Sequence, residues 1–327
     1  MKMHRRLPFA TLLIALLSAC SHEPPKADRP QAKIEEPAPP VAAASKPVIV
    51  PPPEVAILVS SDIPAYRQVA EDISARLGPR ATTWYLHASG ENAKVLADIA
   101  KSRRSQVVAI GLDAAIDANK LADKQVIFCQ VFNYEDHRLT SATHKGVSML
   151  PSFEKSFAAW KAISPGLNEI AVITGPGLSE YVRKADKAAR ANGIVLLHRE
   201  VNSDMELLLE YKSVADKVQG YWLWPDNRVL SNDVIREVLT FSMRNGKQVA
   251  VFNDELLQLG GMISITSDHK DVANNVIERL ERGQGKKAIP GPVIEPLDVA
   301  NLRINGVMAH RFGLTVPDRY RKYLDAP

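Results

Sequence analysis

The sequence predicts an α/β protein with two Rossmann-like lobes, each built around a parallel β-sheet. From residue 54 onward, short β-branched runs alternate with longer stretches whose apolar residues recur at helical spacing, a pattern typical of βαβ units. The pattern starts afresh near residue 152, which indicates a second series of elements. About 270 residues follow residue 53, enough for two lobes of ordinary size.

The first series begins with Val55–Val59, which predicts a buried strand. Residues 64–77 place Tyr66, Val69 and Leu77 on one helical face, and the turn residues Gly78-Pro79 end this helix. The further elements are expected to be a strand at 82–86, a helix at 90–101, a strand at 106–111, a short helix, and a strand at 125–132.

The second series begins with a helix. We expect helices at 152–163, 178–192, 204–216 and 231–245, and strands at 169–174, 194–200, 220–224 and 248–252. In open α/β sheets ligands bind beyond the carboxyl ends of the strands, so the residues that follow each strand are candidates to line a cleft between the lobes.

The N-terminus predicts export. Lys2, Arg5 and Arg6 form a basic head, and residues 7–19 are mostly apolar but too short for a membrane span of about 20 residues. The following motif, Leu17-Ser18-Ala19-Cys20, resembles the lipobox of bacterial lipoproteins. We therefore expect a signal peptide at residues 1–19 and a lipid on Cys20; the alternative is an ordinary signal peptide followed by a chance cysteine.

The segment 20–53 joins the expected lipidated cysteine to the globular part. It is rich in proline and poor in large apolar residues, so it is predicted to be an extended linker that holds the lobes away from the membrane. Ser21 after the cysteine favours the outer membrane over the inner one. The expected location is the periplasmic face of a membrane, with the Cys20 lipid as the anchor.

Composition and charge argue against two classes of function, nucleic-acid binding and thiol chemistry. The net charge is +4, and loss of the three basic residues of the signal would leave about +1, with no basic stripe that would suit nucleic acid. Cys129 lies in an apolar run, which predicts a buried, inert thiol.

No catalytic motif is present in the sequence. The stretch from Gly175 resembles the start of a dinucleotide fingerprint, but Glu180 stands where the third glycine should be. Neither a nucleophile elbow nor a His-Glu-x-x-His motif occurs, and the eight histidines are scattered. We expect no cofactor, no metal and no enzyme activity.

Several motifs in the second half resemble one family. They are Tyr221-Trp222-Leu223-Trp224-Pro225-Asp226-Asn227, Val249-Ala250-Val251-Phe252-Asn253, Gly261-Met262-Ile263-Ser264, and a tail from Leu302-Arg303-Ile304-Asn305 through Ala309, Gly313, Leu314 and Pro317. They are similar to ABC-transporter substrate-binding proteins of the type I periplasmic-binding fold, a group that includes tryptophan-binding members. The likeness covers residues 55–318.

The resemblance implies two lobes joined by a three-strand hinge, with a small ligand enclosed when the hinge closes. It implies a first lobe made of residues 54–143 and 266–292, including a returning helix near 270–283. The second lobe would then comprise residues 144–265 and 293–327.

The resemblance also nominates ligand-binding residues at the strand ends. They are Ser60, Ser61, Asp62, Gly111, Asp113, Gln130 and Asn133 in the first lobe, and Thr174, Gly175, Trp224, Asp226, Asn227 and Asn253 in the second. Helix N-termini after Ser61 and Gly177 offer free N–H groups, while Trp224 or Phe132 offers a ring for stacking. The alternative role for each Asp or Asn is that of a helix cap.

Two functions follow from these features. The first is a lipid-anchored periplasmic solute-binding protein that captures an amino acid or aromatic compound for an ABC permease. The alternative is an outer-membrane lipoprotein that uses the same fold to interact with an envelope protein, and a closed or apolar-filled cleft would favour it.

Overall fold

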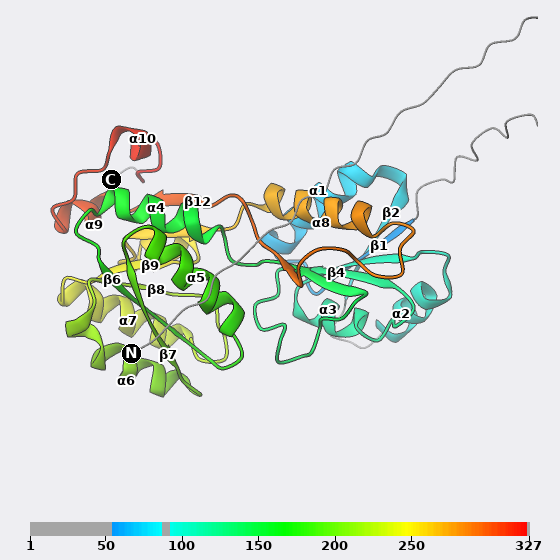
Figure 1. The fold of residues 1–327 in the computed structure, drawn as a ribbon, viewed down its shortest axis with the longest axis horizontal. Coiled ribbons are helices and arrows are strands. Elements are labelled where there is room, and N and C mark those ends of the chain that lie inside the picture. Colours follow the sequence, from blue (N-terminus) through cyan, green and yellow to red (C-terminus); the bar gives the residue numbers. More distant parts are fainter. Residues whose placement is uncertain (1–53, 87–91, 326–327) are drawn as a thin grey trace, which may run out of the picture. The chain divides into compact units, whose positions relative to one another are not determined.

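The computed structural model describes residues 54–86 and 92–325, all of which belong to one compact unit. The predicted signal peptide, Cys20, Ser21 and the linker lie outside the described residues. Two six-stranded sheets form the framework, and helices are interleaved with the strands along the chain (Figure 1). The predicted α/β class with two parallel-rich sheets is therefore confirmed.

The first sheet has the strand order β11-β5-β4-β3-β1-β2, and its strands all run parallel. Its strands are β1 (Val55–Val59), β2 (Ala81–Tyr85), β3 (Gln106–Ile110), β4 (Gln125–Cys129), β5 (His144–Val147) and β11 (Ile294–Glu295). Its helices are α1 (Pro64–Leu77), α2 (Asn92–Lys101), α3 (Leu112–Ala118) and α8 (His269–Gly283).

Alternating residues of β1 show how this lobe is packed. Val55, Ile57 and Val59 belong to the core beneath α1 and α8, whereas Ala56 and Leu58 belong to the core that includes α2 and α3. Figure 1 shows α1 and α8 together on one side of this sheet and α2 and α3 on the other. Both faces are covered, which is why the strand reads as a continuous apolar run.

The second sheet has the order β12-β10-β9-β8-β6-β7, and only β12 runs antiparallel to its neighbour. Its strands are β6 (Glu169–Thr174), β7 (Val195–Glu200), β8 (Gly220–Trp222), β9 (Gln248–Val251), β10 (Ile263–Thr266) and β12 (Asn301–Ile304). Its helices are α4 (Phe153–Ile163), α5 (Ser179–Ala191), α6 (Asp204–Ser213), α7 (Asn232–Arg244), α9 (Gly306–Arg311) and α10 (Asp318–Arg321).

The chain crosses between the sheets three times, after β5, after β10 and after β11. The expected lobe boundaries need adjustment here. Strand β5 pairs with β4, and β11 pairs with β5, so residues 144–147 and 294–295 belong to the first sheet, although both fall in the predicted second lobe. The division of the chain into these two lobes otherwise stays a prediction.

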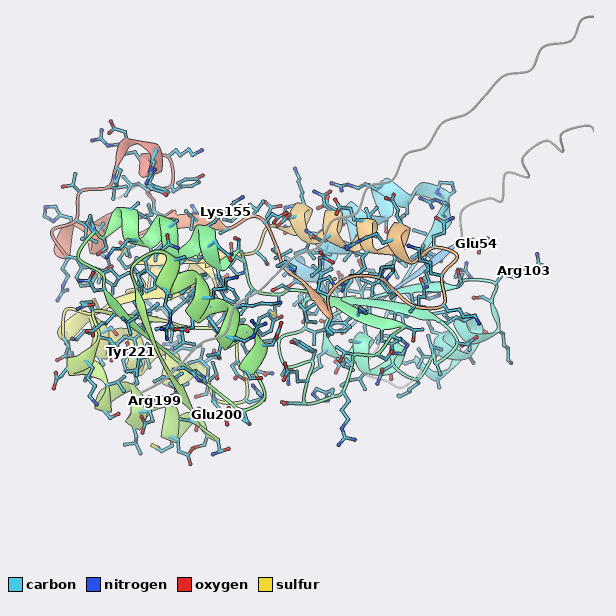
Figure 2. All side chains as sticks on the ribbon, in the orientation of Figure 1. Glu54, Arg103, Lys155, Arg199, Glu200 and Tyr221 are labelled. Atoms are coloured by element: carbon cyan, nitrogen blue, oxygen red, sulfur yellow. The ribbon has the colours of Figure 1, made fainter. Side chains whose placement is uncertain are left out.

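Charged side chains cover the outside of both lobes. Among the residues labelled in Figure 2, Glu54, Arg103, Lys155 and Glu200 are exposed, whereas Tyr221 is buried. Tyr221 stacks on Tyr211 with a ring-centroid distance of 3.7 Å inside the second core of that lobe. Tyr221 is thus a packing residue of this core.

Candidate functional site

The residues that follow β1 and β3 are in close contact with one another. The Ser60 hydroxyl accepts a hydrogen bond from the Ala114 backbone N–H at 2.9 Å, which connects β1 to α3. Gly111 has a φ of 88°, and a Cβ there would lie 2.6 Å from the Ser60 hydroxyl and 2.7 Å from the Tyr66 ring. The glycine is required for this close approach. Ser60 and Gly111 therefore hold the loop together.

The acidic residues at this end face solvent. Asp62 is exposed and pairs with Arg67 on α1 at 2.6 Å, and Asp113 is exposed in the first turn of α3. Ser61 is half-buried. None of these three lines the cavity described below.

The strand-end residues of the second lobe form a closed network. The Thr174 hydroxyl donates to the Gly175 carbonyl at 2.9 Å, and the Gly175 N–H donates to Asp226 at 2.8 Å. Arg228 donates to both carboxylate oxygens of Asp226, at 2.8 Å each, and also to the Pro176 carbonyl. Thr174 and Asp226 are buried, and the oxygen atoms of their side chains already make hydrogen bonds within the protein.

Arg228 also joins the two lobes. It donates a hydrogen bond to Asp136, which follows β4 in the first lobe. Nearby, a Cβ on Gly177 would lie 2.8 Å from the Asp136 carboxylate. The two lobes therefore approach each other closely beside the predicted ligand-binding turn, and Asn227 of that turn is exposed.

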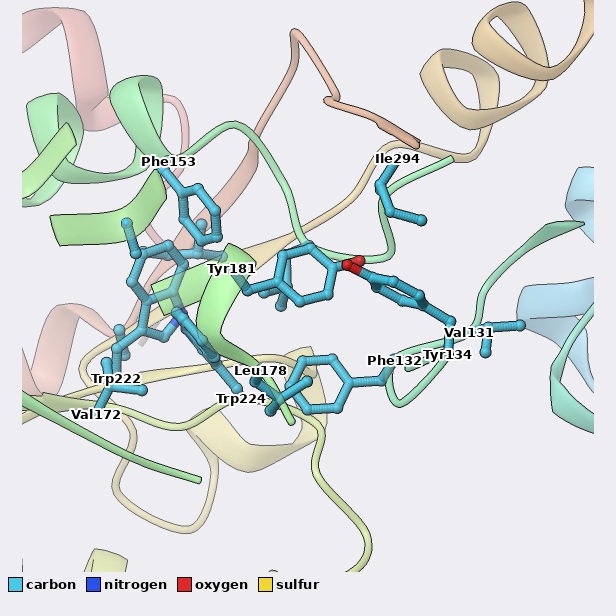
Figure 3. Packing of buried hydrophobic residues seen from close by; sticks show 14 of the residues in the cluster. Val131, Phe132, Tyr134, Phe153, Val172, Leu178, Tyr181, Trp222, Trp224 and Ile294 are labelled. Carbon is cyan, nitrogen blue, oxygen red and sulfur yellow. The ribbon is translucent and has the colours of Figure 1, made fainter. Parts of the chain in front are cut away.

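Aromatic rings fill the space next to this network (Figure 3). We call this set the interlobe aromatic cluster: Phe132 and Tyr134 from the first lobe, and Phe153, Tyr181, Trp222 and Trp224 from the second. Phe132 stacks on Tyr181 with centroids 5.8 Å apart and an interplanar angle of 7°. Trp224 is only 2% exposed, and its buried indole N–H has no hydrogen-bond partner among the residues that the structure describes.

An open cavity of about 540 Å³ shares Trp222 with the interlobe aromatic cluster and has residues of both lobes in its wall. The wall comprises Ile63, Ala65, Tyr66, Gln68, Gln130, Met149, Leu150, Pro151, Trp222, Leu223, Pro225, Phe252, Asn253, Asp254, Ile265, Thr266, Ser267 and His269. We call it the interlobe cavity. Its volume falls within the range typical of small-molecule sites.

Two predicted residues, Gln130 and Asn253, line this cavity. Gln130 follows β4 directly and has a φ of 57°, a conformation that is strained for a residue with a side chain. Asn253 follows β9, and its side chain accepts a hydrogen bond from the Glu255 backbone N–H at 3.0 Å, so it is also a helix cap. Asn133 is half-buried and outside the cavity wall.

Several other wall residues were not predicted. Met149, Leu150 and Pro151 follow β5, and Ile265, Thr266 and Ser267 end or follow β10. These two strands were not expected from the periodicity, so the residues after them could not be nominated. Trp222 was not among the nominated ligand-binding residues; it is 2% exposed, yet part of it forms cavity wall.

The charges of the interlobe cavity are paired. Asp254 accepts a hydrogen bond from Ser264 at 2.6 Å and one from Arg303 at 3.3 Å. His269 Nδ1 lies 2.6 Å from an Asp72 carboxylate oxygen. The described wall contains neither lysine nor arginine. The N-terminus of α1 reaches the wall at Ala65, and its N-cap residue Ile63 makes no side-chain cap hydrogen bond, so no capping side chain competes there with a polar ligand group.

Within the described ranges, no three His, Cys, Asp or Glu side chains gather closely enough to bind a metal ion. None of the helices in those ranges combines the length and apolar character that a membrane span requires. Cys129 is buried, as expected, and burial raises the pKa of its thiol to about 12.

Three solved structures resemble this chain over 84% of its length. One is an ABC domain in complex with L-Trp from Streptococcus pneumonia, with 18% identity, complete coverage of that chain at 100%, and a TM-score of 0.57. Another is a ligand-free, open substrate binding protein with adhesive properties from Clostridium difficile, with 14% identity, 98% coverage and a TM-score of 0.59. A conserved domain protein from Vibrio cholerae matches with 17% identity, 99% coverage and a TM-score of 0.55.

No protein-family sequence model matches the chain, and no curated protein matches it either. At identities of 14% to 18%, the structural likeness concerns the fold. The two six-stranded sheets, the three crossings between them and these likenesses together show that the chain has the type I periplasmic-binding fold.

Proposed function

We propose that the protein binds a small organic molecule in the interlobe cavity and has no catalytic role. The observation that carries this proposal is the cavity of about 540 Å³ whose wall comes from both lobes. A ligand there would contact both lobes at once, so its binding energy would favour a closed arrangement. The L-Trp complex of one structural neighbour is in keeping with a ligand of this size.

The cavity suits a neutral, partly aromatic ligand. Tyr66, Trp222 and Phe252 offer rings, and Gln130, Asn253 and Thr266 offer hydrogen-bonding groups. Since neither lysine nor arginine lies in the described wall and His269 is bonded to Asp72, a ligand carboxylate would depend on the N-terminus of α1. An aromatic compound or an amino acid bound in this way agrees with the function that the sequence resemblance implies.

We propose further that the protein is a lipoprotein, anchored through Cys20 at the periplasmic face of a membrane, with Ser21 favouring the outer membrane. In this proposal it delivers its ligand to an ABC permease. A Cys20→Ser chain tests the anchor, because it should neither incorporate labelled palmitate nor remain with the membrane fraction.

A panel of metabolites tested by thermal shift and calorimetry on the purified full chain tests ligand binding. For the compound that binds, Gln130→Gly should weaken binding about tenfold, because one or two hydrogen bonds of the amide are lost. This variant relieves the strained φ, so weaker binding could not be attributed to unfolding.

Arg138→Gly is the matched control. Arg138 is the other non-glycine residue with positive φ among the described residues, at 50°, and it is exposed and outside the cavity wall. Binding by this variant should equal that of the unmodified chain. No ligand from a broad panel, or equal loss in both variants, would contradict the proposed site.

A second function is favoured by the interlobe aromatic cluster. Its rings and the Arg228 network occupy the strand ends where the resemblance places the ligand, and an apolar-filled cleft suits a protein that interacts with an envelope partner. Crosslinking in cells followed by purification of the full chain would distinguish the two, because recovery of an envelope protein without a permease would favour the interaction role.

A further inference from the structure

A smaller cavity of about 260 Å³ adjoins the interlobe cavity, with which it shares Leu150 and Pro151, and lies beside two of the segments that cross between the lobes. The side chains of Leu150, Phe153, Ile294 and Leu297 give it an apolar lining. Leu150 belongs to the crossing after β5, and Leu297 belongs to the crossing after β11. We call it the hinge cavity, since a molecule bound there would contact both crossings.

Three basic side chains of α5 line the hinge cavity: Arg183, Lys184 and Lys187. Their spacing places them on one face of the helix. Glu180 pairs with Arg183 at 3.1 Å and with Lys184 at 3.2 Å, whereas Lys187 has no carboxylate partner among the described residues. Glu154 is the acidic residue of the wall, so the basic groups outnumber it.

Tyr181 supplies a buried polar group to the same wall. The residue is 2% exposed, and its hydroxyl makes no hydrogen bond of normal geometry within the described residues. Burial raises its pKa to about 12, although Ser148 and the Met149 backbone lie close enough to offset part of this rise. The hydroxyl therefore stays protonated and can donate. Figure 3 shows it directed away from Trp224, toward the side where Tyr134 and Ile294 lie.

We propose that the hinge cavity binds a small amphipathic anion, an aromatic or aliphatic carboxylate whose apolar part contacts Leu150 and Ile294. The carboxylate would accept a hydrogen bond from Tyr181 and pair with Lys187 and its basic neighbours on α5. The volume is sufficient, since a cavity of about 150 Å³ holds a benzene molecule. Tyr181 and the three basic residues line the hinge cavity but not the interlobe cavity, so the proposed site does not depend on the proposed solute.

Benzoate is the probe, and neutral benzamide is its control, with binding to the full chain followed by calorimetry. We expect benzoate to bind with a dissociation constant on the order of 1 mM or tighter, and benzamide at least about tenfold more weakly. Tyr181→Phe should weaken benzoate binding about tenfold by removing only the hydroxyl. Lys187→Glu should reduce it by at least as much.

The matched pair Arg183→Glu and Arg190→Glu separates the site from general charge effects. Both arginines are exposed on α5, and each pairs with an acidic residue of the same helix, Glu180 or Asp186. Only Arg183 lines the hinge cavity, so only Arg183→Glu should weaken benzoate binding.

Three outcomes would overturn the proposal. They are no saturable binding of benzoate at about ten times the expected constant, equal binding of benzamide, and equal loss in both arginine variants. Benzoate binding that falls in Gln130→Gly but not in Lys187→Glu would place the anion in the interlobe cavity instead. Failure of the metabolite panel at the interlobe cavity would leave the benzoate result unchanged.

Discussion

His198 shows how a single side chain couples the stability of the second lobe to pH. It lies on the edge strand β7, and its Nε2 is 2.9 Å from the Thr174 hydroxyl. Since that hydroxyl donates to the Gly175 carbonyl, it accepts the hydrogen bond from a neutral His198. Burial lowers the pKa of His198 below its ordinary value of 6.5. The unfolded chain therefore binds this proton more readily than the folded one.

The protein should thus become less stable as the pH falls below about 6.5, because unfolding takes up protons in that range, and the loss should level off below the folded-state pKa. Urea unfolding at pH 7.5 and pH 5.5 measures this. Burial also lowers the pKa of His144, so His198→Gln should reduce the pH effect without abolishing it. His310→Gln changes an exposed histidine and should leave the effect intact.

Single residues also explain where the site could be predicted and where it could not. Asn253 was found because polar residues after parallel strands meet at one edge of the sheet. Asp226 has the same position in the pattern, but Arg228 two residues later takes both of its carboxylate oxygens. The spacing of the two residues in the sequence does not show that the side chain of Arg228 turns back onto Asp226.

At the scale of the element, helices were predictable because two signals in the sequence agree: the helical spacing of apolar residues and the residues typical of helix ends. Helices α1, α4, α5 and α7 begin and end within two residues of the predicted limits, and serine residues cap α4, α6 and α7. Strands β5 and β11 have four and two residues, too few for a period to be recognised. Strand β4 ends at Cys129 because Gln130 takes a positive φ. The predicted strand continued to residue 132 because Val131 and Phe132 are also apolar.

The cap of α6 provides a test at this scale. The Ser203 hydroxyl accepts a hydrogen bond from the Glu206 backbone N–H at 3.2 Å, and Glu206 accepts one from the Asn202 backbone N–H at 2.7 Å. Ser203→Ala should lower the free energy of unfolding by about 1 kcal/mol, whereas Ser203→Gly should lower it by only a few tenths. Equal losses in urea unfolding would show that the hydroxyl is not the source of the cap's stability.

At the scale of the whole molecule, Arg228 links the two lobes, and we expect its loss to have a large effect on the free energy of unfolding. It connects the buried Asp226 of the second lobe to Asp136 of the first. The interlobe aromatic cluster packs across the same junction through the stacked rings of Phe132 and Tyr181. The Arg228–Asp136 contact and the wall of the interlobe cavity therefore both involve residues of the two lobes.

Removing the Arg228 guanidinium and removing the Asp136 carboxylate should have very different effects on the free energy of unfolding. Arg228→Gln leaves the carboxylate of Asp226, which is 2% exposed, without its positive charge, so the free energy of unfolding should fall by about 3 kcal/mol or more. Asp136→Asn removes only a half-exposed partner and should cost about 1 kcal/mol or less. Urea unfolding measures both changes. Because Asp136→Asn weakens the tie between lobes while leaving the second-lobe network whole, it should also speed ligand entry into the interlobe cavity, and an unchanged association rate would show that Arg228 stabilises its own lobe alone.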